Sequence, residues 1–239
     1  MQDEVTKHTR KIFGIMKNAK QSFSGKIKEI TIEILIIVFA VTVSIWLHSW
    51  SQHNHQQKEV KEFLADIKED IKDNIKTMTE AKQTLSRMAN NFGYLEKIDE
   101  VQYDSIVKKA GSDTVIANKF GVEIIIRRNT NGNYEGFKSS GKIGYIENKK
   151  LKKLILAYYQ QDIPSFIEVD NYYNQLMKEW MTCMMDEDSK TMKEFFFTTK
   201  INRRITFIHK AAIDCGKSYD EGIKSAKAII AEIDKENLE

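Results

Sequence analysis

Residues 30–50 read ITIEILIIVFAVTVSIWLHSW, and this stretch decides the fold class. From Ile34 to Leu47 it carries no charged side chain, and its polar side chains there are Thr42 and Ser44. A helix of about 20 mostly apolar residues is long enough to cross the hydrocarbon core of a bilayer. The sequence therefore predicts a single transmembrane helix over residues 29–50. A buried core helix is the alternative, which the length and the flanking residues disfavour.

Side chains at the edges and in the middle of this helix have predicted roles in the membrane. Glu33 lies one turn from the start, where its carboxylate can reach the headgroup layer. Trp46 and Trp50 lie at the other end, where indole rings favour the membrane–water interface. Ala40 and Ser44 form a small-xxx-small pair, a pattern that lets two membrane helices approach closely. The first three are predicted interface anchors, and the pair is a predicted packing face.

The basic residues are concentrated in front of the apolar stretch. The 239 residues contain 37 Lys and Arg and 34 Asp and Glu, a net charge of +3. Residues 1–28 hold seven bases and two acids, whereas residues 51–239 hold equal numbers of each. Because basic flanks stay in the cytoplasm, residues 1–28 are a predicted cytoplasmic tail and the rest is extracytoplasmic. The predicted location is a bacterial inner membrane with a periplasmic domain. No nucleic-acid partner is expected, since that would need a basic folded domain.

A heptad-like stripe follows the apolar stretch. Residues 51–92 contain no Gly and no Pro, and apolar residues recur there every three or four positions. The predicted stripe comprises Leu64, Ile67, Ile71, Met78, Leu85 and Met88. One interpretation is a coiled-coil-like stalk that pairs with a second copy or a protein partner. The other is an amphipathic helix that lies against its own domain.

Residues 93–239 are a predicted extracytoplasmic helical domain. Asn148 is a typical N-cap of a helix that would end near Gln161. Capping-box patterns at Ser165 and Ser218 predict two further helix starts, and Ser189 opens another candidate helix. Residues 129–147 hold four Gly and are the predicted main loop. The segment 122–128, VEIIIRR, is rich in β-branched residues and fits a short strand, but its helical surroundings favour a helix.

Two stretches of the chain resemble a known family. At the span these are Glu33-Ile34 and Trp50, with Ala40 and Ser44 standing where Gly and Ala are usual, and His48 where Asn is usual. The second stretch runs from Tyr134 to Ile143 (YEGFKSSGKI) and continues through Ile146, Asn148, Leu151 and Tyr158-Tyr159. Both are similar to single-pass inner-membrane proteins of Bacteroidota, a family known only as a domain of unknown function. The resemblance implies one membrane helix and a helical ectodomain, and it implies no activity.

Motifs that suggest chemistry are weak throughout the chain. Residues 136–143 approach a phosphate-binding loop, but Ile143 stands where Ser or Thr would hold Mg²⁺. His48, His53 and His55 lack the i, i+4 spacing of a helical metal site. Arg127 and Arg128 are expected on a solvated surface. We therefore expect no cofactor, no metal and no catalytic residue.

Cys183 and Cys215 are the only cysteines. A disulfide between them is one interpretation, since an oxidising compartment permits it. Two free, buried thiols are the other, because Cys183 lies on an apolar helix stripe where free Cys is a common small hydrophobe.

Taken together, these features predict a mainly all-α, membrane-anchored interaction or scaffold protein, a subunit or accessory of a membrane complex. Its expected partners are the lipid bilayer and proteins in the membrane or periplasm, a second copy among them. A sensory ligand-binding ectodomain that signals through a separate partner is the alternative, and an enzyme comes third.

Overall fold

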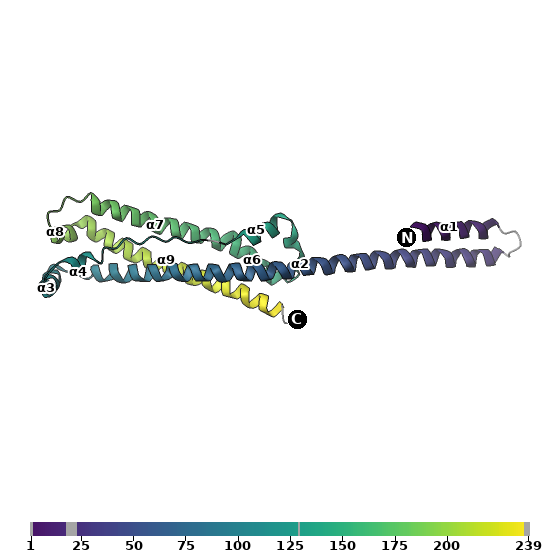
Figure 1. Ribbon diagram of the computed structural model, residues 1–239, viewed down its shortest axis with the longest axis horizontal. Helices are drawn as coiled ribbons and strands as arrows, with labels where there is room; N and C mark the ends of the chain where they lie inside the picture. The colour runs from purple at the N-terminus through teal and green to yellow at the C-terminus, as the bar shows by residue number, and fades with distance from the viewer. Residues whose placement is uncertain (1, 18–22, 129, 237–239) are drawn as a thin grey trace. The chain divides into compact units, whose positions relative to one another are not determined.

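The computed structural model describes residues 2–17, 23–128 and 130–236, and it is mainly helical (Figure 1). No strand occurs among these residues, which confirms the mainly all-α fold class. The α-helices are α1 (Gln2–Lys17), α2 (Phe23–Leu95), α3 (Glu100–Ala110), α4 (Thr114–Ala117), α5 (Gly132–Ser139), α6 (Lys149–Ala157), α7 (Ile163–Met185), α8 (Met192–Phe197) and α9 (Thr199–Glu236). A 3₁₀ turn at Lys142–Tyr145 and a π turn at Tyr158–Asp162 complete the described elements.

The chain divides into two compact units, Met1–Glu59 and Val60–Glu239. The division differs from the predicted one, in which residues 51–92 form a stalk separate from the domain that follows. Residues from Val60 to Leu95 of α2 belong to the second unit and contribute to its core. Each unit is described by itself below.

The first unit contains the apolar part of α2. One helix of the described chain is long and apolar enough to cross a membrane, and only 6% of its apolar window is buried. Large side chains there lie open, among them Leu35, Phe39 and Ile45. In water so much exposed apolar surface is unfavourable, whereas lipid covers it at no cost. The structure is thus compatible with a single-pass membrane protein.

The second unit is a helical bundle in which the stripe of α2 is buried. The members of the predicted stripe are at most 3% exposed: Leu64, Ile67, Ile71, Met78, Leu85 and Met88. Aromatic contacts tie α2 to its neighbours, since Phe63 stacks on Phe137 of α5 and Phe92 meets Trp180 of α7 edge-on. These contacts agree with the second interpretation of the stripe, in which the helix lies against its own domain.

One predicted helix start is confirmed by the structure, and two others are wrong. Asn148 caps α6 as expected, and its side chain accepts a hydrogen bond of 3.0 Å from the N–H of Leu151. The predicted start at Ser165 is wrong, because α6, the π turn and α7 run on without a break. Pro164 falls in the first turn of α7, directly after the π turn. The predicted start at Ser218 is also wrong, because this residue lies inside α9 and bonds back to the carbonyl of Asp214.

The helix expected at residues 122–128 is wrong. Residues 121–128 form neither helix nor strand but an extended connection between α4 and α5, which we call the strap (Figure 1). Val122, Ile124 and Ile126 point outward, while Ile125 faces the core. This alternation is the period of two of an extended chain. Part of the predicted loop that follows is helical, as α5, and Gly141 ends that helix at a φ of 75°.

Candidate functional site

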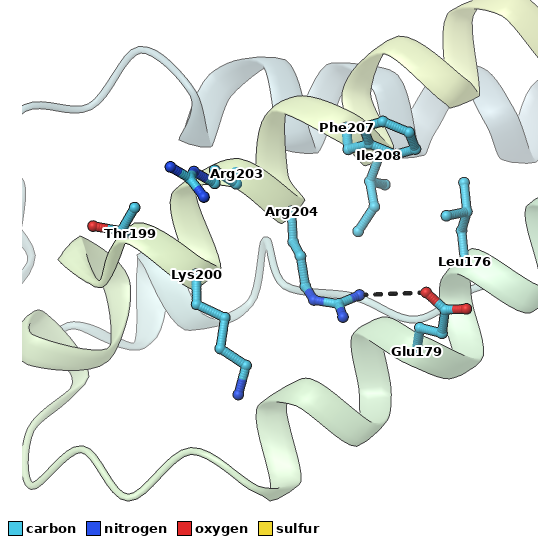
Figure 2. Close-up of a pocket in the computed structure, with 8 residues that line it drawn as sticks. All are labelled: Leu176, Glu179, Thr199, Lys200, Arg203, Arg204, Phe207 and Ile208. Carbon is cyan, nitrogen blue, oxygen red and sulfur yellow. Dashed lines mark ion pairs between the residues drawn. The ribbon is translucent and has the colours of Figure 1, made fainter.

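The second unit carries a groove between α7 and α9. Its volume is about 580 Å³. It is lined by Leu176 and Glu179 from α7 and by Thr199, Lys200, Arg203, Arg204, Phe207 and Ile208 from α9 (Figure 2). We call these eight residues the α7–α9 groove.

The helical repeat places the lining residues of α9 on one side of that helix. They fall in three pairs spaced four residues apart, beginning at Thr199, Arg203 and Phe207, which is the spacing of one helix face. The next face holds Ile201 and Ile205, which are fully buried in the core. Burial of the isoleucine face therefore fixes which way the basic residues of α9 point.

The groove has weak internal ion pairs and a basic rim. Arg204 Nη1 lies 3.6 Å from Glu179 Oε2 across the groove (Figure 2). Lys200 Nζ lies 3.4 Å from Glu187 Oε2. Arg203 makes no ion pair with any residue that the structure describes. Exposed pairs of this kind contribute about 0–1 kcal/mol, so an incoming carboxylate can compete for these cations.

Apolar surface lies beside the cations. Phe207 is 57% exposed, and Leu176 and Ile208 line the same groove. A second pocket of about 490 Å³ shares Glu179, Lys200 and Arg204 with the groove and extends it along α7, adding Met181, which is 45% exposed. Cations beside an open aromatic ring suit recognition of a partner that is both acidic and apolar.

The lining residues offer little for covalent chemistry. The eight include one carboxylate, Glu179, and one hydroxyl, Thr199, and they include no His and no Cys. Glu179 is already engaged with Arg204. The arrangement places cations beside apolar surface, which can bind and orient a ligand.

None of the residues singled out as chemistry-bearing motifs is among the eight that line this groove. His48, His53 and His55 are exposed on α2, and His55 lies 3.6 Å from Glu59. Among the described residues no group of three or more His, Cys, Asp or Glu is placed to hold a metal ion. The stretch resembling a phosphate loop forms α5 and its end, and the hydroxyls of Ser139 and Ser140 donate to carbonyls of that same helix.

The predicted membrane residues lie on the apolar part of α2. Glu33 is 4% exposed, because α1 covers it: His8 Nδ1 and Lys11 Nζ each approach one of its carboxylate oxygens to 2.5 Å. The sequence placed Glu33 at an interface but gave no sign of these partners. Trp46 and Trp50 are exposed, with no protein cover over their rings.

No other part of the described chain fully covers the predicted packing pair of the span. Ala40 is exposed and Ser44 is half-buried. Pairing through this face of the span stays a prediction.

Both cysteines are buried, and both thiols are free. Burial raises the pKa of Cys215 to about 11. Of the two interpretations of Cys183 and Cys215, the structure holds the one with free thiols.

A buried polar network under the strap was missed by sequence reasoning. Arg127 was expected on the surface, but its side chain is fully buried and its guanidinium lies 3.0 Å from Asp170. Tyr219 donates a hydrogen bond to the other oxygen of Asp170. Burial raises the pKa of Asp170, and the Arg127 charge opposes that rise. Because the charges of Arg127 and Asp170 offset each other under the strap, this network holds the strap in place.

Two asparagines complete the attachment of the strap region. Asn174 of α7 accepts from the N–H of Ile125 at 2.8 Å and donates to its carbonyl at 2.7 Å. Asn74 of α2, fully buried, bonds Thr130 in the same two-fold manner at 3.1 and 3.2 Å. Each side-chain amide takes the place of a neighbouring strand, which satisfies a backbone that has no sheet partner.

No protein-family model matches the chain, and neither curated proteins nor solved structures give a match. The resemblance to membrane proteins of Bacteroidota therefore stays a prediction.

Proposed function

We propose that this chain is a membrane-anchored interaction protein of a bacterial inner membrane, a subunit or accessory of a membrane complex. One observation carries the proposal: the apolar helix has almost no protein cover, while the bundle beyond it buries its own core and leaves the α7–α9 groove open. An anchor together with an open recognition surface is what an interaction protein of a membrane requires.

The proposed orientation has residues 1–28 in the cytoplasm and the bundle in the periplasm. It rests on the seven bases before the apolar stretch and the neutral charge balance after it. Protease treatment of spheroplasts tests it with a tag at each end. A C-terminal tag should be digested and an N-terminal tag protected, and the reverse pattern would overturn the orientation.

The anchor is tested by fractionation under an alkaline wash. The full chain should stay with the membrane pellet, whereas residues 60–239, exported with a cleavable leader, should be released. Release of both forms would show that the apolar helix does not span.

The interaction role is tested by cross-linking in native membranes, followed by mild detergent extraction. A specific protein partner should be recovered with the full chain, and loss of the bundle should abolish the recovery. A chain that stays monomeric and recovers no partner would count heavily against the proposal.

A sensory ligand-binding ectodomain is the second candidate. The observation in its favour is the groove volume of about 580 Å³, within the range of about 300–1,000 Å³ of small-molecule sites. A screen of small metabolites that raises the melting temperature would promote it, and a flat screen would demote it.

A further inference from the structure

We infer that the α7–α9 groove receives an acidic amphipathic helix of a partner protein. The inference rests on the proposed interaction function and names the chemistry of the partner. Three properties of the groove lead to it: its length, its charge and its exposed apolar side chains.

The groove and the pocket that extends it form one surface along two helices. They share Glu179, Lys200 and Arg204. Along α7 and its C-cap the combined lining reaches from Gln175 to Asp186, which at 1.5 Å per residue is about 17 Å. That length accommodates about three turns of a docked helix. Helices that dock in such grooves use apolar residues at i, i+3, i+4 and i+7 as anchors.

The charge of the surface selects an acidic partner. Lys200 and Arg204 extend from α9 toward α7, whereas Arg203 lies on the outer rim (Figure 2). Arg203 has no ion pair among the described residues, and the other two cations have only the long pairs given above. Glutamates flanking the apolar anchors of a partner helix would meet all three cations. Guanidinium groups are well suited to this, because they bind carboxylates with two parallel hydrogen bonds.

The exposed side chains favour a helix over a small molecule. Phe207 and Met181 are open, and half of the Lys200 side chain is in solvent. A drug-sized ligand is usually buried by about 70–90% in its site, and walls this open do not enclose one. A helix laid along the groove would cover Phe207 and Met181 with its own apolar face. Aromatic and methionine side chains are enriched in interfaces of this kind.

A designed peptide pair tests the inference on the full chain in nanodiscs of zwitterionic lipid. The probe is a labelled helical peptide with leucines at the anchor positions and flanking glutamates. Its control has the same composition in scrambled order, which removes the apolar face. Fluorescence anisotropy should show the amphipathic peptide binding about tenfold or more tightly than the scrambled one, with affinity that falls as salt is raised.

Matched variants locate the binding. Lys200→Glu should weaken the binding of the amphipathic peptide by about tenfold. Lys217→Glu, which changes another exposed, ion-paired lysine on the same helix about 25 Å away, should leave the binding unchanged. Phe207→Ser changes a side chain that is largely exposed, and it should also weaken the binding of this peptide. Unchanged far-ultraviolet circular dichroism establishes that the variants are folded.

Three outcomes would overturn the inference: equal binding of both peptides, equal effects of Lys200→Glu and Lys217→Glu, or displacement of the peptide by a small anionic amphiphile such as 4-phenylbutyrate at the same concentration. The last result would make the groove a small-molecule site. None of these outcomes contradicts the proposed function, which is contradicted separately if cross-linking in native membranes recovers no partner.

Discussion

Gly222 of α9 lies against the ring of Phe166 on α7, and adding one methyl group there tests the packing of the bundle. A Cβ atom on Gly222 would lie 2.2 Å from Cζ of Phe166 on α7 and within 2.9 Å of two more ring atoms. The ring has little room to retreat, because it is 5% exposed and the guanidinium of Arg127 lies 5.6 Å from its centre. Gly216, on the same helix, has no atom within 4 Å of its Cβ position. The two glycines therefore share a helix but differ in the room available for a methyl group.

The magnitudes follow from two opposing effects. Replacing Gly by Ala inside a helix stabilises by about 0.5–1 kcal/mol, because the unfolded chain has less freedom to lose. Forcing an extra methyl group into a packed core costs about 1–3 kcal/mol. Gly216→Ala should thus raise the free energy of unfolding by about 0.5–1 kcal/mol. Gly222→Ala should lower it by about 1–2 kcal/mol, the clash less the helix gain.

Urea unfolding of the full chain in detergent micelles measures both changes, followed by the emission of the buried Trp180. Phe166→Leu provides the control, since a smaller side chain leaves space for the new methyl group. Gly222→Ala should then cost less in the Phe166→Leu background than in the wild type, by a coupling energy of about 1 kcal/mol. If Gly222→Ala stabilises as much as Gly216→Ala does, the close approach of α7 and α9 is refuted.

Three further predictions follow from the buried polar groups. Asn174→Ala removes both hydrogen bonds to Ile125, so deuterium exchange at the Ile125 amide should speed up by about tenfold or more; an unchanged rate would mean that Asn174 does not hold the strap. Burial raises the pKa of Tyr158 and Tyr159, so these phenols stay protonated in the native protein when unfolded ones ionise near pH 10. The free energy of unfolding should therefore be unaffected by them below about pH 10 and fall as the pH rises above it, and a flat alkaline profile in urea titrations would contradict this. Because burial raises the pKa of Cys215 to about 11, its alkylation by iodoacetamide at neutral pH should be slow in the native protein and complete in denaturant; fast native labelling would show an exposed thiol.

The parts of the fold that sequence reasoning anticipated are those set by local, periodic physics. The apolar stretch of residues 30–50 needs only a count of uncharged residues against the thickness of a bilayer. The stripe from Leu64 to Met88 needs only the 3.6-residue repeat, and its members are buried. The cap at Asn148 is a local hydrogen bond that depends on residues three positions apart. None of these requires knowledge of a distant partner.

The strap was not predicted because its partners are distant in sequence. Ile125 is held by Asn174, 49 residues away, and Thr130 by Asn74, 56 residues away. Arg127 can be buried because Asp170 of α7 forms an ion pair with its guanidinium and the ring of Tyr219 on α9 lies against it. The local pattern of β-branched residues fitted a short strand, but residues 121–128 form an extended segment without a strand partner. It could not indicate that side-chain amides would replace a neighbouring strand.

The groove escaped prediction for a related reason. Lys200, Arg203 and Arg204 read as an ordinary solvated face of a helix, and nothing in their spacing differs from other basic faces of the chain. The groove exists because α7 lies beside that face and contributes Glu179 and Leu176. The local signal that could have been followed is Phe207, a large apolar residue one helical turn after Arg203 and so on the same face as these cations.

The burial of the α2 stripe also limits how this protein can meet a partner. Phe63 stacks on Phe137 and Phe92 meets Trp180 edge-on, so the stripe between them is covered by the protein's own helices. Pairing of two copies through that stripe would require the bundle to open and expose side chains such as Ile67, Ile71 and Met88, each worth about 1.5–3 kcal/mol of burial. A partner is met at much lower cost through surfaces that are already open. Among the described residues these are the uncovered face of the apolar helix, including Ala40, and the α7–α9 groove. In the proposed function, a partner in the membrane would use the first of these faces and a partner of the bundle the second.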